Sequence, residues 1–132
     1  MQVGDDLPSF TKEISQEKIN RYADASGDYN PLHIDPEFAQ KTMFQGTIGH
    51  GLMTLAYLSE MMTRYLGEGW ISGGNMEVTF LAPTRPGKSY TTKGKVVDKR
   101  EEAGARLVEC EVWCEDAEGN KVVSGKTVGK VL

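Results

Sequence analysis

The fold is decided by residues 49–66, GHGLMTLAYLSEMMTRYL. The apolar residues of this stretch recur at helical spacing, and early in it they cover nearly the whole circumference of the helix that they predict. A helix that is apolar all round is a buried helix. At about 1.5 Å per residue it is roughly 27 Å long, which is enough to cross a small domain. Gly67 and Gly69 end the pattern.

Helical patterns precede this stretch, and strand patterns follow it. Ser15 and Asp35 are suited to cap two short helices, and Gly27 is suited to end the first of them. Strands are predicted at residues 10–14, 76–80, 88–99, 105–115 and 121–131. Helices followed by strands, without βαβ alternation, predict one α+β domain over residues 1–132, in which an antiparallel β-sheet wraps a long buried helix.

Composition excludes several classes of protein. The chain has 132 residues, and its 15 basic against 19 acidic side chains give a net charge of −4, which argues against a nucleic-acid binder. No apolar run approaches the ~20 residues that a membrane span requires. The first six residues have neither the basic start nor the apolar core of a secretory leader. We therefore expect a cytoplasmic protein with no nucleic-acid or membrane partner.

The two cysteines, Cys110 and Cys114, lie four residues apart on a predicted strand. At ~3.3 Å per residue their Cα atoms are roughly 13 Å apart, whereas a disulfide needs Cα atoms within ~7 Å. They share one strand face with Val108 and Val112. We expect two small buried hydrophobic side chains and, without a Cys-x-x-Cys pair, no zinc site.

The reactive groups concentrate in one loop, residues 26–35, SGDYNPLHID, between two predicted helices. Pro31 stiffens this loop. Asp28 and His33 lie five residues apart across a turn, so their side chains could converge on one water molecule and act as a general acid and base. A structural alternative stays open at this point, in which Asp28 only caps the turn and His33 is a satisfied core histidine.

A second candidate element is the glycine-rich entry to the long helix, residues 46–52, GTIGHGL. Free backbone N–H groups at a helix N-terminus favour negative charge, which is what an oxyanion site for a carbonyl that gains charge in a transition state requires. Glycine lets a substrate approach the backbone closely. The alternative is that the glycines only permit tight packing of the helix against the sheet. For His50 we expect a role in fixing the loop by hydrogen bonding.

Three other patterns are disfavoured as sites. His33, Asp35 and His50 have the outline of a two-histidine, one-carboxylate iron site, but Asp35 is better used as a helix cap. Ser59 lacks the Gly-x-Ser-x-Gly surroundings of a nucleophile. A group of basic side chains could meet coenzyme phosphates or guard a sheet edge: Arg85, Lys88, Lys93, Lys95, Lys99 and Arg100. We expect no metal and no cofactor.

Residues 22–59 resemble the MaoC-like, (R)-specific enoyl-CoA hydratase family. The resemblance rests on the run Asp28-Tyr29-Asn30-Pro31-Leu32-His33 and on the later His50-Gly51, and residues 76–87 also look like the family's strand and turn. It implies a hotdog fold and a homodimer, or a higher oligomer, whose sheets join beside an acyl-thioester channel. The motif places no Arg or Lys that would hold the phosphates of a coenzyme. The carrier of the acyl group is therefore open between coenzyme A and acyl carrier protein.

The resemblance also implies a role for individual residues. Asp28 and His33 are the implied catalytic pair, and the N–H of Gly51 is the implied donor to the thioester oxygen. Residues implied in substrate binding are Asn30, Leu52, Tyr57 and Ser59. The implied reaction is hydration of a trans-2-enoyl thioester, or the reverse dehydration. The alternatives are a hotdog acyl-CoA thioesterase and a non-catalytic subunit that binds acyl thioesters.

Overall fold

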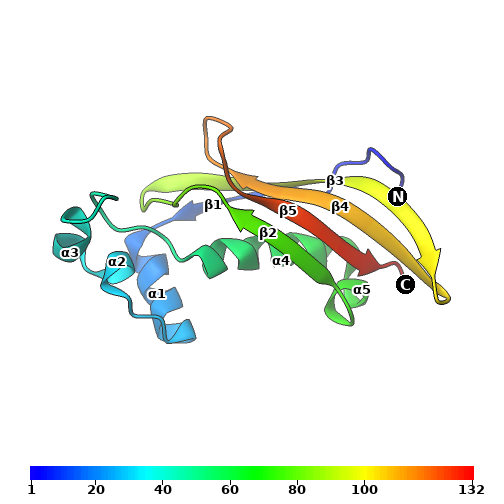
Figure 1. Cartoon of the computed structure of the whole chain (residues 1–132), viewed down its shortest axis with the longest axis horizontal. Coiled ribbons are helices and arrows are strands. Elements are labelled where there is room, and N and C mark those ends of the chain that lie inside the picture. The colour runs from blue at the N-terminus through cyan, green and yellow to red at the C-terminus, as the bar shows by residue number, and fades with distance from the viewer.

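The structure is a computed structural model that describes residues 1–132, and it has two main layers. A curved β-sheet lies across the long helix α4, and the short helices α1 to α3 extend beyond one end of the sheet (Figure 1). The elements are β1 (Phe10–Ile14), α1 (Gln16–Ser26), α2 (Pro31–Ile34), α3 (Pro36–Gln40), α4 (Gly51–Leu66), α5 (Glu68–Ile71), β2 (Asn75–Phe80), β3 (Lys88–Glu102), β4 (Ala105–Glu115) and β5 (Lys121–Lys130).

The sheet has five strands in the order β1-β3-β4-β5-β2, and every neighbouring pair is antiparallel. The predicted α+β class and all five predicted strands are therefore confirmed. β3 continues three residues beyond its predicted end, to Glu102, with a register shift between Val96 and Asp98. The two edges of the sheet are β1 and β2.

α4 packs one face against the sheet. Its buried face contributes Met53, Leu58, Met61 and Met62 to a core that the sheet completes with valines and cysteines of β3, β4 and β5. The expectation that this helix is buried all round is wrong for the single chain, because the sheet covers only one side and Leu52 stays 62% exposed. No helix of the chain is both long and apolar enough to cross a bilayer.

α4 begins at Gly51, two residues later than the pattern predicts. The N–H of Gly49 donates to the carbonyl of Thr84 at 2.9 Å, which ties this residue to the segment after β2. His50 is extended, with φ −66° and ψ 133°, and serves as the N-cap without a side-chain capping bond. The entry to α4 is therefore held against the sheet end before the first helical turn starts.

The caps around the reactive loop are those that the sequence predicts. The Ser15 hydroxyl accepts from the N–H of Lys18, and Gly27 ends α1 in the left-handed region at φ 80°. The carboxylate of Asp35 accepts from the first N–H groups of α3, at Glu37 and Phe38. The loop between α1 and α3 thus has two fixed ends.

Cys110 and Cys114 are free thiols that are fully buried on β4. Burial raises the pKa of Cys110 to about 11 and that of Cys114 to about 12. The expectation of two small buried side chains that do not pair is confirmed.

Candidate active site

Asp28 lies in a loop that is braced by its own side chains. Its carboxylate accepts from the N–H of Asn30 at 3.1 Å, and its own N–H donates to the Ser26 hydroxyl at 3.2 Å. The Asn30 side chain in turn accepts from the N–H of Leu32 at 3.0 Å and caps α2. Asn30 therefore shapes the loop, and the carboxylate of Asp28 stays exposed to solvent.

His33 is held in one orientation on α2. Its Nδ1 lies 2.8 Å from the carbonyl oxygen of Ile48. Because a carbonyl only accepts, Nδ1 carries the hydrogen in the neutral ring, and Nε2 is left with a free lone pair. The backbone carbonyl of His33 accepts from the amide of Gln16 at 2.8 Å, and Gln16 accepts from the hydroxyl of Thr47 at 2.6 Å. Gln16 and Thr47 support the loop through contacts that have no motif in the sequence.

His50 connects Asp28 to His33. Its ring is 2% exposed, and its Nε2 lies 3.0 Å from the backbone carbonyl of Asp28. The ring stacks on that of His33 at a centroid distance of 4.0 Å and meets Tyr22 at 4.8 Å. The expectation that His50 fixes the loop by hydrogen bonding is confirmed.

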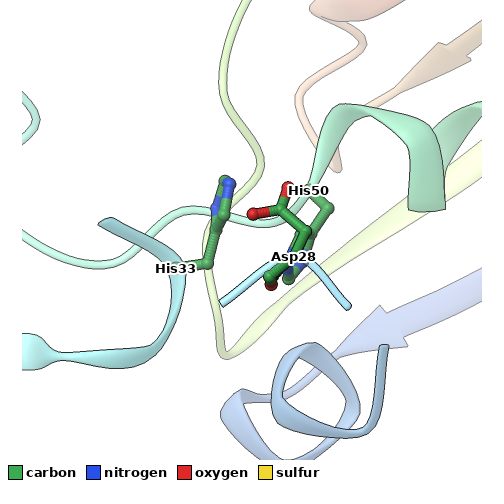
Figure 2. Close-up of side chains that lie close together, drawn as sticks. All are labelled: Asp28, His33 and His50. Atoms are coloured by element: carbon green, nitrogen blue, oxygen red, sulfur yellow. Dashed lines mark hydrogen bonds between the residues drawn. The ribbon is translucent and has the colours of Figure 1, made fainter. Parts of the chain in front are cut away.

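The carboxylate of Asp28 points toward the ring of His33, with His50 beside it (Figure 2). One ligand atom from each of these three side chains lies within 4.8 Å of the other two. The disfavoured iron-site outline of His33, Asp35 and His50 is not formed, because Asp35 is occupied in capping α3. His50 is also a poor metal ligand in this arrangement, since its Nε2 is bonded to the Asp28 carbonyl and its Nδ1 is sealed in protein. The geometry fits a proton-transfer pair with a supporting histidine.

The N-terminus of α4 presents unused donors. The N–H groups of Gly51 and Leu52 make no hydrogen bond within the chain. A Cβ on residue 51 would lie 3.1 Å from Cε1 of Phe80, so only glycine leaves the ring of Phe80 in its present contact. Gly51 therefore offers a free N–H at a place where a larger residue would press against Phe80.

A cavity of about 320 Å³ lies against His33 and Gly51, and Asp28 and His50 do not line it. It is lined by His33, Phe44, Ile48, Gly49, Gly51, Thr54, Phe80, Leu81, Ala82, Pro83, Thr84, Val122 and Val123. His33 and Gly51 thus share a mostly apolar cavity. Such a lining, with few polar groups, is typical of sites for small organic ligands.

In the single chain, the three residues of α4 that are implied in substrate binding lie outside the cavity. Ser59 accepts from the indole N–H of Trp70 at 3.1 Å, and the ring of Tyr57 lies under the ammonium of Lys12 at 5.5 Å. Neither residue lines the cavity, and neither does the exposed Leu52. Ser59 is eight residues, or about 12 Å, along the helix from Gly51. A substrate-binding role for these three residues stays a prediction.

The basic side chains of β3 are largely paired with acidic ones. Lys93 lies 3.2 Å from Glu115, Lys95 lies 3.2 Å from Asp6, and Arg100 contacts three carboxylates. Arg85 follows the cavity-lining Thr84 and donates to the carbonyl of Gly46 at 3.4 Å. A role of these side chains at coenzyme phosphates stays a prediction.

Residues 4–118 match the family model described as MaoC like domain. The chain is 35% identical over 125 residues to the 3-hydroxybutyryl-CoA dehydratase of Methylorubrum extorquens, with 91% of this chain and 74% of that protein covered. It is 37% identical over 84 residues to the (R)-specific enoyl-CoA hydratase of Rhodospirillum rubrum, with 63% of this chain covered. In this last alignment the chain spans 58% of the relative's length.

Solved structures share the fold. The (R)-hydratase from Aeromonas caviae superimposes with a TM-score of 0.86 at 24% identity, covering 100% of this chain and 98% of that one. The MaoC-like dehydratase from Rhodospirillum rubrum gives a TM-score of 0.84 at 23% identity, covering 100% of this chain and 93% of that one. These likenesses confirm the predicted hotdog arrangement.

Proposed function

The chain belongs to the MaoC-like family, and from this premise we propose that it hydrates trans-2-enoyl thioesters to (R)-3-hydroxyacyl thioesters or catalyses the reverse dehydration. The observation that carries the proposal is the convergence of Asp28 and His33 beside a cavity that is lined by His33 and by Gly51, whose N–H is free. The names of relatives, an enoyl-CoA hydratase and a 3-hydroxybutyryl-CoA dehydratase, support this class of reaction and substrate.

The chemistry needs a base, a water and a way to accept charge. In the proposed reaction Asp28 removes a proton from a water that also hydrogen-bonds to Nε2 of His33, and the water oxygen attacks C3 of the enoyl group. The π electrons move toward the thioester oxygen, where the N–H of Gly51 stabilises the developing charge. The proton taken up by the pair returns to C2, so one water is added overall.

The magnitudes place the contribution of Gly51 at the lower end of that of the acid–base pair. Loss of one donor of an oxyanion hole typically raises the barrier by about 3 kcal/mol, or about 10²-fold in rate. General acid–base catalysis typically contributes about 10²- to 10⁴-fold. The free N–H at the first residue of α4 lies at the positive end of a 16-residue helix, which strengthens its attraction to a negatively charged oxygen.

We also propose that the active form is a homodimer. Three large apolar side chains beside the cavity mouth and on the uncovered side of α4 are at least half exposed: Leu52, Phe80 and Leu81. β2 is an edge strand, so one row of its backbone groups has no partner within the sheet. Pairing of two copies through this edge would join the sheets and cover the apolar side chains. Coenzyme A or acyl carrier protein as the carrier, and the cytoplasm as the location, stay predictions.

Incubation with crotonyl-CoA tests the function. Loss of the enoyl absorbance without release of free thiol is the expected result. Release of thiol would instead indicate a hotdog thioesterase, and binding without turnover would indicate a non-catalytic acyl-thioester-binding subunit. His33→Ala serves as the matched variant, and its retention of the full hydration rate would contradict the assignment of this residue.

A further inference from the structure

Thr54 is a nearly buried residue whose hydroxyl the chain leaves unused. It lies one turn after Gly51 on α4, is 3% exposed and lines the same cavity. Its N–H donates to the carbonyl of His50, but its hydroxyl makes no hydrogen bond with any group of the chain. On the same helix, Thr63 shows the usual solution, donating its hydroxyl to the carbonyl of Ser59 at 2.8 Å.

A hydroxyl without a partner at the wall of a mostly apolar cavity is informative. A hydroxyl that is sealed in protein without a partner costs about 1–3 kcal/mol, and the large majority of such groups are satisfied in native proteins. The other unpaired hydroxyl of the cavity wall, on Thr84, is sealed from solvent. The hydroxyl of Thr54 is not sealed, so a group that enters the cavity can reach it.

The position of Thr54 indicates which group of a bound ligand its hydroxyl would contact. Side chains of a helix lean toward its N-terminus, so the Thr54 side chain leans toward the turn of Gly51. Residues three apart on a helix have side-chain origins about 5–6 Å apart. An acceptor about 3 Å from the N–H of Gly51 is then also within reach of the hydroxyl. Among the other lining residues, Phe80, Val122 and Val123 offer no side-chain donor.

We propose that the Thr54 hydroxyl is a second hydrogen-bond donor to the thioester oxygen, beside the N–H of Gly51. This inference rests on the proposed hydration of enoyl thioesters. The two donors together form an oxyanion site with one backbone arm and one side-chain arm, both on the first turns of α4. Because the charge on the oxygen grows toward the transition state, the second donor acts mainly on kcat.

The test compares Thr54→Val with Thr54→Ser. Valine matches the shape of threonine without the hydroxyl, and serine keeps the hydroxyl. With crotonyl-CoA, Thr54→Val should lower kcat by about 10- to 100-fold with KM within about threefold, and Thr54→Ser should restore most of the rate. Thr63→Val is the control on the same helix and should leave kcat unchanged.

Stability gives a second readout. Because no group of the chain bonds the Thr54 hydroxyl, Thr54→Val should melt at the same temperature as the wild type or above it. A melting temperature clearly below that of wild type, restored by serine, would assign the hydroxyl to a protein partner and overturn the inference. Thr54→Ala provides the same kinetic comparison if the valine variant does not fold.

The outcomes separate this inference from the proposed function. A wild type that hydrates crotonyl-CoA and a Thr54→Val variant with unchanged kcat would overturn the inference alone. A wild type without any turnover would refute the function. Calorimetric binding of butyryl-CoA, a saturated thioester, then tests the hydroxyl: weaker binding by Thr54→Val than by Thr54→Ser supports the contact, and equal binding overturns it.

Discussion

Gly51→Ala separates the catalytic use of the α4 N-terminus from its packing. The added Cβ would lie 3.1–3.3 Å from three carbons of the Phe80 ring, which is closer than ordinary contact. Phe80 is half exposed at the end of β2, so its ring can withdraw by a few tenths of an ångström. Alanine also favours the helix over glycine by up to about 1 kcal/mol. The two effects oppose each other, and we expect the free energy of unfolding to change by less than about 1 kcal/mol.

The effect on activity should be much larger. The new methyl group would enter the space between residue 51 and the cavity-lining ring of Phe80, and we expect it to hold the thioester oxygen out of hydrogen-bond distance of the N–H of residue 51. Loss of one such donor corresponds to about 3 kcal/mol, so kcat/KM for crotonyl-CoA should fall by about 10²-fold. Initial rates from the enoyl absorbance and a thermal melt measure both quantities.

The matched control is Gly46→Ala, whose Cβ would meet only Nη1 of Arg85 at an ordinary 3.6 Å. This variant should keep both its rate and its melting temperature. If Gly51→Ala kept wild-type kcat/KM while remaining folded, the N–H of Gly51 would not be at the reacting carbonyl, and the proposed oxyanion site would be refuted.

Three further changes test the surroundings of the site. His50→Phe keeps a ring on His33 but removes the bond to the Asp28 carbonyl; we expect about 1–3 kcal/mol less stability and a roughly tenfold lower kcat, and an unchanged rate would contradict the positioning role. Ser59→Ala should cost about 1 kcal/mol through the lost Trp70 bond; the predicted substrate-binding role requires that it also lower kcat/KM, and an unchanged kcat/KM would remove Ser59 from the substrate site. The two β4 thiols, whose pKa values burial raises to about 11 and about 12, should resist iodoacetamide at about pH 8 until the protein is denatured; labelling of the native protein would contradict their burial.

The parts of the fold that the sequence predicts correctly depend on local signals. Ser15, Gly27 and Asp35 cap or end helices through bonds to residues at most four positions away, so their types suffice to predict them. The exposure of Leu52 is different, because it depends on how far the sheet wraps around α4. A pattern along one helix gives its apolar residues but not the extent of the surface that covers them.

The candidate site also has a part that local sequence signals predict and a part that depends on distant segments of the chain. Asp28 and His33 are five residues apart in one stiffened loop, and the structure brings them together as the sequence predicts. The cavity walls at Phe80, Thr84 and Val122 come from segments far along the chain, which no local pattern connects to the loop. The bond that occupies Ser59 likewise depends on where α5 places the indole of its partner.

The central claim, that the carboxylate of Asp28 acts as the base, is tested most directly by Asp28→Asn. The asparagine side chain keeps an oxygen that can accept from the N–H of Asn30, so the loop should retain its shape while the base is lost. We expect butyryl-CoA binding within about threefold of wild type and a hydration rate for crotonyl-CoA lower by at least about 10²-fold. A folded Asp28→Asn variant that hydrates crotonyl-CoA at the wild-type rate would contradict the account.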